Sequence, residues 1–268
     1  MNAHRRSCVL GACGAAAWAL AMPLRAAAQA AALVIAADLP ALVAASKASV
    51  LPVGTFSPTA SPRFGFRGSG FVVGDGSLVV TNFHVLPAAA DAAESGARLV
   101  VMVGRSENSL RNARLVASDR PRDLALLQIE GAPLPALGLA EAGSAREGQD
   151  VVLMGYPIGG VLGFATITHR GIISSITSTA LPANSASQLD PRAISQLRQG
   201  SFEMLQLDAT AYPGSSGGPL FDASSGRVIG VVSMGLLKGT RESALSSPTG
   251  ITYAVPVQFV HELLKQPR

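Results

Sequence analysis

Residues 68–86 read GSGFVVGDGSLVVTNFHVL, two runs rich in β-branched residues on either side of the turn Gly74-Asp75-Gly76. A Gly-Asp-Gly turn between two such runs is a strong signal for a β-hairpin. Further short runs of the same kind follow in the rest of the chain.

Short apolar runs follow at regular intervals toward the C-terminus. They are RLVVMVG (98–104), NARLVASD (112–119), LALLQIE (124–130), DVVLMGYP (150–157), TITHRGIISSIT (166–177), MLQLDA (204–209), RVIGVVSM (227–234) and ITYAVPV (251–257). Each run is too short for a core helix, and no long helical period separates them. We therefore expect an all-β protein, either a barrel or a sandwich, rather than alternating strands and helices.

The two ends of this region differ from the strand pattern. Residues 31–48 are Ala-rich with apolar residues at helical spacing, which predicts a short N-terminal helix, and the Pro- and Gly-rich stretch up to residue 65 is typical of a linker. Near the C-terminus, PVQFVHELLKQ (256–266) predicts a second short helix. Its expected apolar face consists of Val257, Val260, Leu263 and Leu264.

Residues 1–30 have the composition of a cleaved secretory signal peptide: a basic start, an apolar run rich in Ala and Gly, and small residues before Ala31. A retained membrane anchor is the weaker alternative, because the apolar run is short for a membrane span. We expect a periplasmic or secreted bacterial protein with no stable membrane insertion after cleavage. Arg5 and Arg6 fit a twin-arginine signal but also any basic leader, so the export route stays open.

Both cysteines, Cys8 and Cys13, lie in this leader, so the exported chain is expected to hold no disulfide. No Cys–His cluster with metal-ligand spacing occurs in the sequence, and we expect neither a metal nor an organic cofactor. The chain has 21 Lys and Arg against 17 Asp and Glu, and three of the arginines belong to the leader. The remaining charge is nearly balanced, which argues against nucleic acid as a partner.

Two adjacent serines lie between glycines in AYPGSSGGPLF (211–221). Such clusters ordinarily mark turns. His84, at the end of the predicted hairpin, and Asp123, just before an apolar strand, are each more often structural than catalytic when taken alone. Together, however, the three segments supply a nucleophile, a base and an acid.

A serine hydroxyl is unreactive until a base takes its proton, and a histidine with its ordinary pKa of about 6.5 suits that task at neutral pH. We predict Ser216 as the nucleophile, His84 as the base and Asp123 as the acid that orients the imidazole. The backbone N–H groups of Gly214 and Ser216 are the predicted oxyanion hole. The order His, Asp, Ser differs from that of α/β-hydrolases, and an esterase of that type would require a helix after Ser216.

Several separated motifs, in this order, resemble the trypsin-like protease domain of the HtrA/Deg family. They are GSGFVV, VVTNFHV, RDLALLQI, GYPIG, RGIISSI, QLDATAYPGSSGGPLFD and GITYAVPV. The resemblance implies a chymotrypsin-like fold over residues 66–268, with two six-stranded antiparallel β-barrels (approximately 66–145 and 146–256) and a short C-terminal helix. It also implies an active site between the barrels.

The same resemblance implies an ATP-independent serine endopeptidase that hydrolyses unfolded or damaged exported polypeptides. The segment 231–235 is expected to pair with the substrate as an added strand, through Val232, Ser233, Met234 and Gly235. Thr210 matches a position at the base of the primary specificity pocket and supplies no acid there. The resemblance therefore implies cleavage after small or medium apolar residues rather than after Arg or Lys.

The chain also departs from the family. Ser215 stands where the family usually has Asn, a change we expect to be mild because this residue acts through its backbone. The sequence stops at Arg268, so we expect no PDZ domain, and the homotrimer of some relatives is left open. The polar segment 181–200 is a candidate gate, and His169 and His261 are expected to be structural or surface residues. The alternative function is a catalytically silent peptide-binding or chaperone-like module on the same fold.

Overall fold

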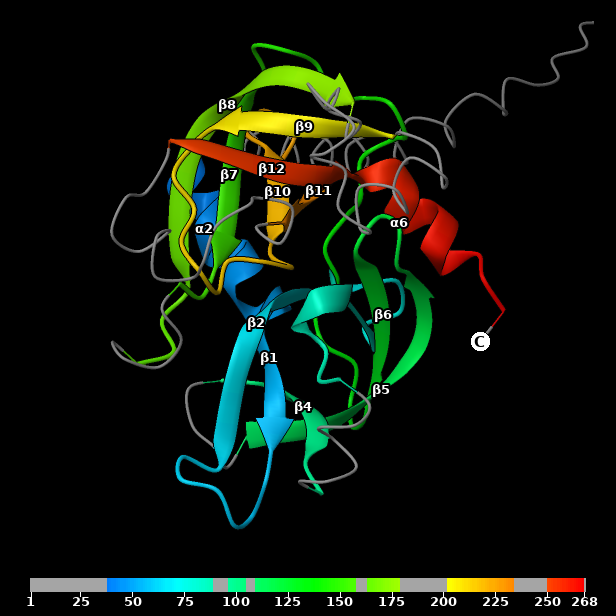
Figure 1. Ribbon diagram of the computed structural model, residues 1–268. Coiled ribbons are helices and arrows are strands. Elements are labelled where there is room, and N and C mark those ends of the chain that lie inside the picture. The colour runs from blue at the N-terminus through cyan, green and yellow to red at the C-terminus, as the bar shows by residue number, and fades with distance from the viewer. Residues whose placement is uncertain are drawn as a thin grey trace, which may run out of the picture.

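The computed structural model describes residues 38–88, 96–104, 109–157, 163–178, 202–233 and 250–267. Within these residues, twelve strands form two closed β-barrels of six strands each (Figure 1). All neighbouring strands within a barrel are antiparallel. The prediction of an all-β, chymotrypsin-like double barrel is confirmed.

The first barrel has the strand order β1-β2-β3-β6-β5-β4 and the second β10-β11-β12-β9-β8-β7. The strands of the first are β1 (Val50–Phe56), β2 (Phe64–Val73), β3 (Leu78–Asn82), β4 (Arg98–Met102), β5 (Leu110–Asp119) and β6 (Leu124–Ile129). Those of the second are β7 (Asp150–Gly155), β8 (Ile167–Ser178), β9 (Glu203–Asp208), β10 (Pro219–Asp222), β11 (Val228–Ser233) and β12 (Ile251–Pro256).

The predicted hairpin is confirmed as β2 and β3, which pair with Phe71 opposite Val80. Its turn is held by Asp75, whose Oδ1 accepts hydrogen bonds from the backbone N–H of Ser77 at 3.0 Å and from its hydroxyl at 2.6 Å. Such a local side-chain bond favours a turn over a continued strand. The turn thus fixes the register of β2 and β3, and His84 follows directly after β3 in the chain.

The prediction of a linker before residue 66 is wrong for Val50–Phe56, which form β1 and complete the first barrel. Pro52 lies in the part of β1 that pairs with β2 alone, because pairing with β4 begins at Val53. A strand accepts proline where one side of its backbone is unpaired. Burial of the apolar residues of β1 outweighs the turn propensity of its Pro and Gly.

Within the described part of the predicted N-terminal helix lies α2 (Leu39–Ser46), followed by the 3₁₀ turn η1 (Lys47–Ser49). The part of the predicted helix before residue 38 lies outside the described residues, as does the predicted signal peptide. In the described part of the chain, no helix is long and apolar enough to span a membrane.

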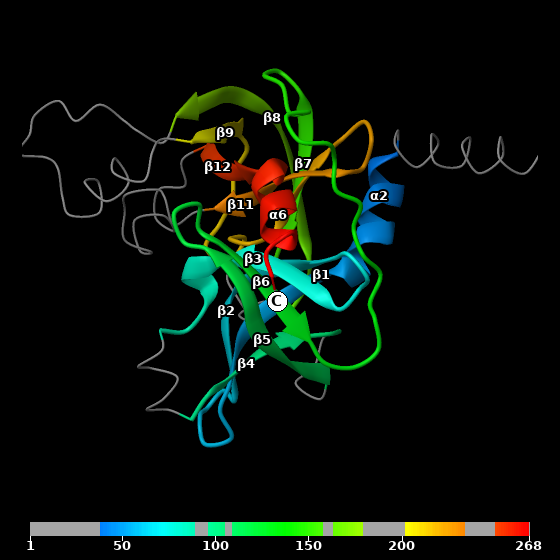
Figure 2. The ribbon, with the colours of Figure 1, turned by 90° about the vertical axis from the view of Figure 1, so that its right-hand side faces the viewer.

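The C-terminal helix, α6 (Val257–Leu264), is confirmed and packs against strands of both barrels. Figure 2 shows it between β11 and β12 on one side and β5 and β6 on the other. Its buried residues are Val257, Phe259, Val260 and Leu263. Since the main core cluster also joins residues of both barrels, such as Phe71 and Leu207, the barrels share one continuous apolar interior.

Candidate active site

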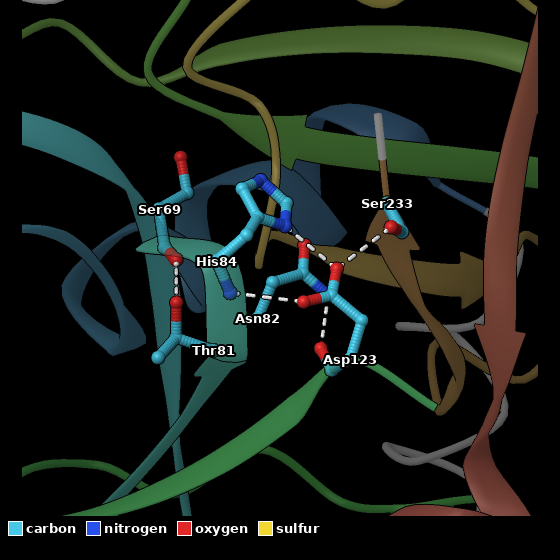
Figure 3. A network of polar contacts seen from close by, with 6 residues as sticks. All are labelled: Ser69, Thr81, Asn82, His84, Asp123 and Ser233. Carbon is cyan, nitrogen blue, oxygen red and sulfur yellow. Dashed lines mark hydrogen bonds and ion pairs between the residues drawn. The ribbon is translucent and has the colours of Figure 1, made fainter. Parts of the chain in front are cut away.

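His84 lies in a 3₁₀ helix, η2 (Phe83–Val85), directly after β3. It meets Asp123 at two points: Asp123 Oδ1 accepts the backbone N–H of His84 at 2.9 Å, and Asp123 Oδ2 lies 2.6 Å from His84 Nδ1 (Figure 3). The His84 side chain is 39% exposed and that of Asp123 is 14% exposed. The ring is thus held by its inner nitrogen while it remains accessible to a reactant.

Asp123 occupies the turn between β5 and β6, immediately before β6, as predicted. Its φ of 57° lies in the left-handed region, which is uncommon for a residue with a side chain. Its carbonyl oxygen accepts bonds from the N–H of Phe83 and from the amide of Asn82, both at 3.0 Å. Backbone and carboxylate of Asp123 are therefore both bound to the segment that carries His84.

A third contact to the Asp123 carboxylate comes from the second barrel. The hydroxyl of Ser233, at the end of β11, donates to Asp123 Oδ2 at 3.1 Å (Figure 3). This oxygen therefore interacts with both His84 and Ser233, and its position depends on how the two barrels meet. The sequence predicts Ser233 as a substrate-binding residue, whereas the structure gives its hydroxyl this different partner.

The glycine-rich segment that contains Ser216 lies between β9 and β10. The Ser215 carbonyl accepts a hydrogen bond from the N–H of Gly218 at 3.0 Å. Because a trans peptide directs its C=O and N–H to opposite sides, the N–H of Ser216 points away from Gly218. The hydrogen bond thus fixes the orientation of the peptide between Ser215 and Ser216.

Two glycines of this segment adopt conformations that a side chain would not tolerate. Gly214 has φ 104° and Gly217 has φ 84°. A Cβ at Gly217 would also collide with the carbonyl of Ser69 and the hydroxyl of Thr81. The loop of Ser216 thus packs against Ser69 on β2 and Thr81 on β3, and Thr81 is three residues before His84 in the chain.

Ser69, on β2, fixes this loop from the first barrel. Its N–H donates to the Ser216 carbonyl at 2.8 Å, and its hydroxyl donates to the Gly214 carbonyl at 2.7 Å. The same hydroxyl accepts the N–H of Tyr156 at 2.9 Å, and the Ser69 carbonyl accepts the hydroxyl of Thr81 at 2.7 Å (Figure 3). Ser69 was not among the predicted site residues, although a serine between glycines in an apolar strand was the available signal.

The other predicted substrate-binding residues differ in burial, and two of them lie outside the described residues. Val232 is fully buried, its N–H donates to the Gly218 carbonyl and its carbonyl accepts the N–H of Gly217. The backbone of Val232 thus supports the loop of Ser216, and pairing of segment 231–235 with a substrate stays a prediction. Thr210 is half-buried just after β9, and Met234 and Gly235 lie outside the described residues, as does the candidate gate 181–200.

The two remaining histidines of the described part of the chain have other partners. His261, on α6, has its Nε2 2.8 Å from the carbonyl of Ala140. His169, on β8, packs its ring 5.8 Å from the ring of Tyr212, and burial lowers the pKa of His169 below its ordinary value. Among the described residues, no group of three or more His, Cys, Asp or Glu side chains could hold a metal.

The strand β10 begins three residues after Ser216, so the helix that an α/β-hydrolase elbow requires is absent from this described segment. The esterase alternative is therefore excluded. Two closed six-stranded barrels of this topology, with a His–Asp pair, are typical of the chymotrypsin-like class of proteins.

The chain belongs to the family described as trypsin-like peptidase domain, whose model matches residues 68–231, more than half of the sequence. It is 31% identical over 199 residues to a protein of Pseudomonas fluorescens named "Probable periplasmic serine endoprotease DegP-like", covering 74% of this chain and 34% of that protein. A Marinomonas protein of the same name is 30% identical over 214 residues, covering 79% of this chain and 38% of that protein. The chain therefore spans about a third of the length of these relatives.

Solved structures agree with this assignment at the level of the fold. The serine endoprotease from Yersinia pestis superposes with a TM-score of 0.56 at 24% identity, covering 84% of this chain and 64% of that one. An HtrA-type protease solved with a tripeptide gives a TM-score of 0.55 at 24% identity, covering 84% and 61%. The resemblance to the HtrA/Deg proteases drawn from the motifs is confirmed.

Proposed function

We propose that this chain is a serine endopeptidase in which Ser216 is the nucleophile, His84 the general base and Asp123 the orienting acid. The observation that carries the proposal is the two-point contact of Asp123 with the backbone and ring of His84. The loop of Ser216 packs against Thr81, three residues before His84 in the chain. A carboxylate at His84 Nδ1 leaves Nε2 as the nitrogen that takes a proton from a serine.

In the first half of the reaction, Ser216 Oγ attacks the carbonyl carbon of the scissile peptide bond while its proton passes to His84 Nε2. The carbonyl π bond opens and its electron pair moves to the oxygen, which becomes an oxyanion. When this intermediate collapses, the C–N bond breaks and the leaving amine takes the proton from His84. A water molecule then releases the acyl group by the same steps, with His84 again as the base.

The oxyanion is stabilised by the N–H groups of Gly214 and Ser216. Support comes from the orientation of the Ser216 N–H and from the bonds that hold the Gly214 and Ser216 carbonyls to Ser69. Donors fixed before the reaction need no reorganisation when charge develops, and each is worth about 100-fold or more in rate.

The substrates in this proposal are unfolded or damaged polypeptides of the bacterial periplasm. The predicted N-terminal signal peptide would export the chain to that compartment. The names of the relatives, periplasmic serine endoproteases, support the location and polypeptides as substrates. We propose cleavage after small or medium apolar residues, because Thr210 brings no acid that would pair with Arg or Lys. Equal or faster cleavage after Arg in a peptide library would contradict this preference.

The proposal is tested by labelling the chain from Ala31 onward with a fluorophosphonate, together with a casein digestion assay. Labelling and digestion are both expected, and both should vanish in Ser216→Ala. The matched control is the adjacent Ser215→Ala, which should still be labelled because the Ser215 hydroxyl is buried without a hydrogen-bond partner. Labelling that follows Ser215 instead, or no labelling of folded protein, would favour another nucleophile or the silent binding module.

A further inference from the structure

The turn that carries Asp123 places this residue in the left-handed region, at φ 57°. Asp tolerates this region better than most residues, and contacts around the turn add to what holds it. Inside the turn, the N–H of Asp123 donates to the Arg120 carbonyl at 3.1 Å, and the N–H of Arg122 donates to Asp119 Oδ1 at 3.2 Å. The residues on either side of Pro121 therefore matter for where the carboxylate lies.

Arg122 connects this turn to the C-terminal helix. Its guanidinium carbon lies 4.2 Å from the centre of the Phe259 ring on α6, and its NH1 lies 2.7 Å from Asp119 Oδ2 and 3.4 Å from Glu262 Oε2. The Phe259 ring is itself fixed, edge to face, by Phe202 at 5.5 Å. A planar guanidinium that is stacked on one face and paired at its edge has little freedom to move.

Arg120 makes a second stack, on the segment that carries His84. Its guanidinium carbon lies 4.7 Å from the centre of the Phe83 ring, and Phe83 is the residue before His84 in η2. The N–H of Phe83 also donates to the Asp123 carbonyl at 3.0 Å. The turn is thus bound through Arg120 to the base and through Arg122 to the second barrel's terminal helix.

We propose that Arg120 and Arg122 are positioning residues for the carboxylate of Asp123. This rests on the proposed function. The same carboxylate oxygen meets His84 of the first barrel and Ser233 of the second, so a small rotation of the turn would lengthen one contact or the other. The two stacks oppose that rotation. Arg120 anchors the turn to η2, which carries His84, and Arg122 anchors it to α6, which follows the last strand of the second barrel.

The first test measures peptide hydrolysis by Arg122→Met and Arg120→Met, which keep side-chain length but remove the charge and the planar stack. We expect kcat to fall about 3- to 10-fold in each, the range of one cation–π contact, with KM within about two-fold of the wild type. Arg122→Lys keeps the charge over the ring and should give a kcat between those of Arg and Met. Thermal unfolding of each variant shows whether it is folded.

A matched control is Arg98→Met, because Arg98 stacks on Phe56 at 4.8 Å in the first barrel, on β4 and β1. It should keep the kcat of the wild type. The inference is overturned if Arg122→Met and Arg120→Met keep kcat within two-fold, if they act on KM alone, or if Arg98→Met loses as much.

A second readout does not depend on catalysis. The short contact between His84 Nδ1 and Asp123 predicts a low-field proton resonance, which should be present in the wild type and lost or broadened in Arg122→Met. An unchanged resonance in that variant contradicts the positioning role. If the wild type is not labelled by the fluorophosphonate, the proposed function fails, and the resonance still decides whether Arg122 positions Asp123.

Discussion

The backbone N–H of Ser69, in the first barrel, donates to the carbonyl of Ser216, in the second, at 2.8 Å. The nucleophile loop is therefore shaped by a strand of the opposite barrel as well as by its own glycines. With the Ser233 contact to Asp123, both halves of the site carry a bond from the other barrel. The contacts of the site are thus complete only where the two barrels meet.

Ser69→Ala should reduce both stability and reactivity. The hydroxyl bonds to the Gly214 carbonyl and the buried Tyr156 N–H would be lost, and leaving a buried group unpaired costs about 1–3 kcal/mol. We expect a lower denaturation midpoint in urea and slower fluorophosphonate labelling of the molecules that remain folded. Ser57→Ala, at an exposed turn, is the control. Labelling of Ser69→Ala at the wild-type rate would show that this hydroxyl does not shape the loop.

Asp123→Asn keeps the size of the side chain but removes the acceptor charge at His84 Nδ1. The imidazole would then favour the wrong tautomer, and kcat should fall by about 10⁴-fold, as it does when such an acid is neutralised in other triads. Steady-state kinetics on a peptide substrate measures this. Asp150→Asn, which removes an exposed carboxylate paired with Arg170 at 3.3 Å, should change kcat little. A loss of less than about ten-fold in Asp123→Asn would argue against the assigned role.

Asp222 should make the free energy of unfolding fall as the pH is lowered through the acid range. Burial raises the pKa of this carboxyl, but hydrogen bonds from Ser225, Gln149 and Ser224 outweigh it and hold the pKa below the ordinary value of 3.8. The stabilisation is therefore complete above the ordinary pKa and is lost as pH falls through the lower, folded-state value. Asp222→Asn should flatten this part of the profile, measured by urea unfolding from about pH 2 to 6. An unchanged acid slope in Asp222→Asn would contradict it.

His169 should also make the folded chain less stable as the pH falls, although here the folded state disfavours the charged form of the side chain and not the neutral form. Because burial lowers its pKa below 6.5, the folded chain keeps His169 neutral at pH values where the unfolded chain already binds a proton. Its effect is absent above pH 6.5, and stability falls as pH drops from there toward the folded-state pKa. His169→Leu should remove this loss between pH 6.5 and 5, whereas a profile identical to that of the wild type would contradict the buried, neutral state.

Much of the fold and site was predictable because local signals agreed. The Gly-Asp-Gly turn fixed one hairpin, the short apolar runs matched strands of both barrels, and His84, Asp123 and Ser216 lie in the predicted order along the chain. What could not be predicted depends on contacts between distant segments. Pro52 suggests a linker until β2 is seen beside it, and the partners of Ser69 are 87 and 145 residues away.

The partners of the predicted substrate-binding strand could not be read from the sequence for the same reason. Val232 and Ser233 lie in the expected strand, but its register directs the first to the nucleophile loop and the second to Asp123. Sequence pattern gives the alternation of a strand, whereas the neighbour that each position meets is decided by how the two barrels pack.

The most direct test of Ser216 as the nucleophile is to map the fluorophosphonate adduct by peptide mass spectrometry of the folded, wild-type chain. The expected result is one adduct per chain, on Ser216, formed at a rate that falls sharply in His84→Ala. An adduct on Ser215 or elsewhere, or a rate unaffected by the loss of His84, would contradict it.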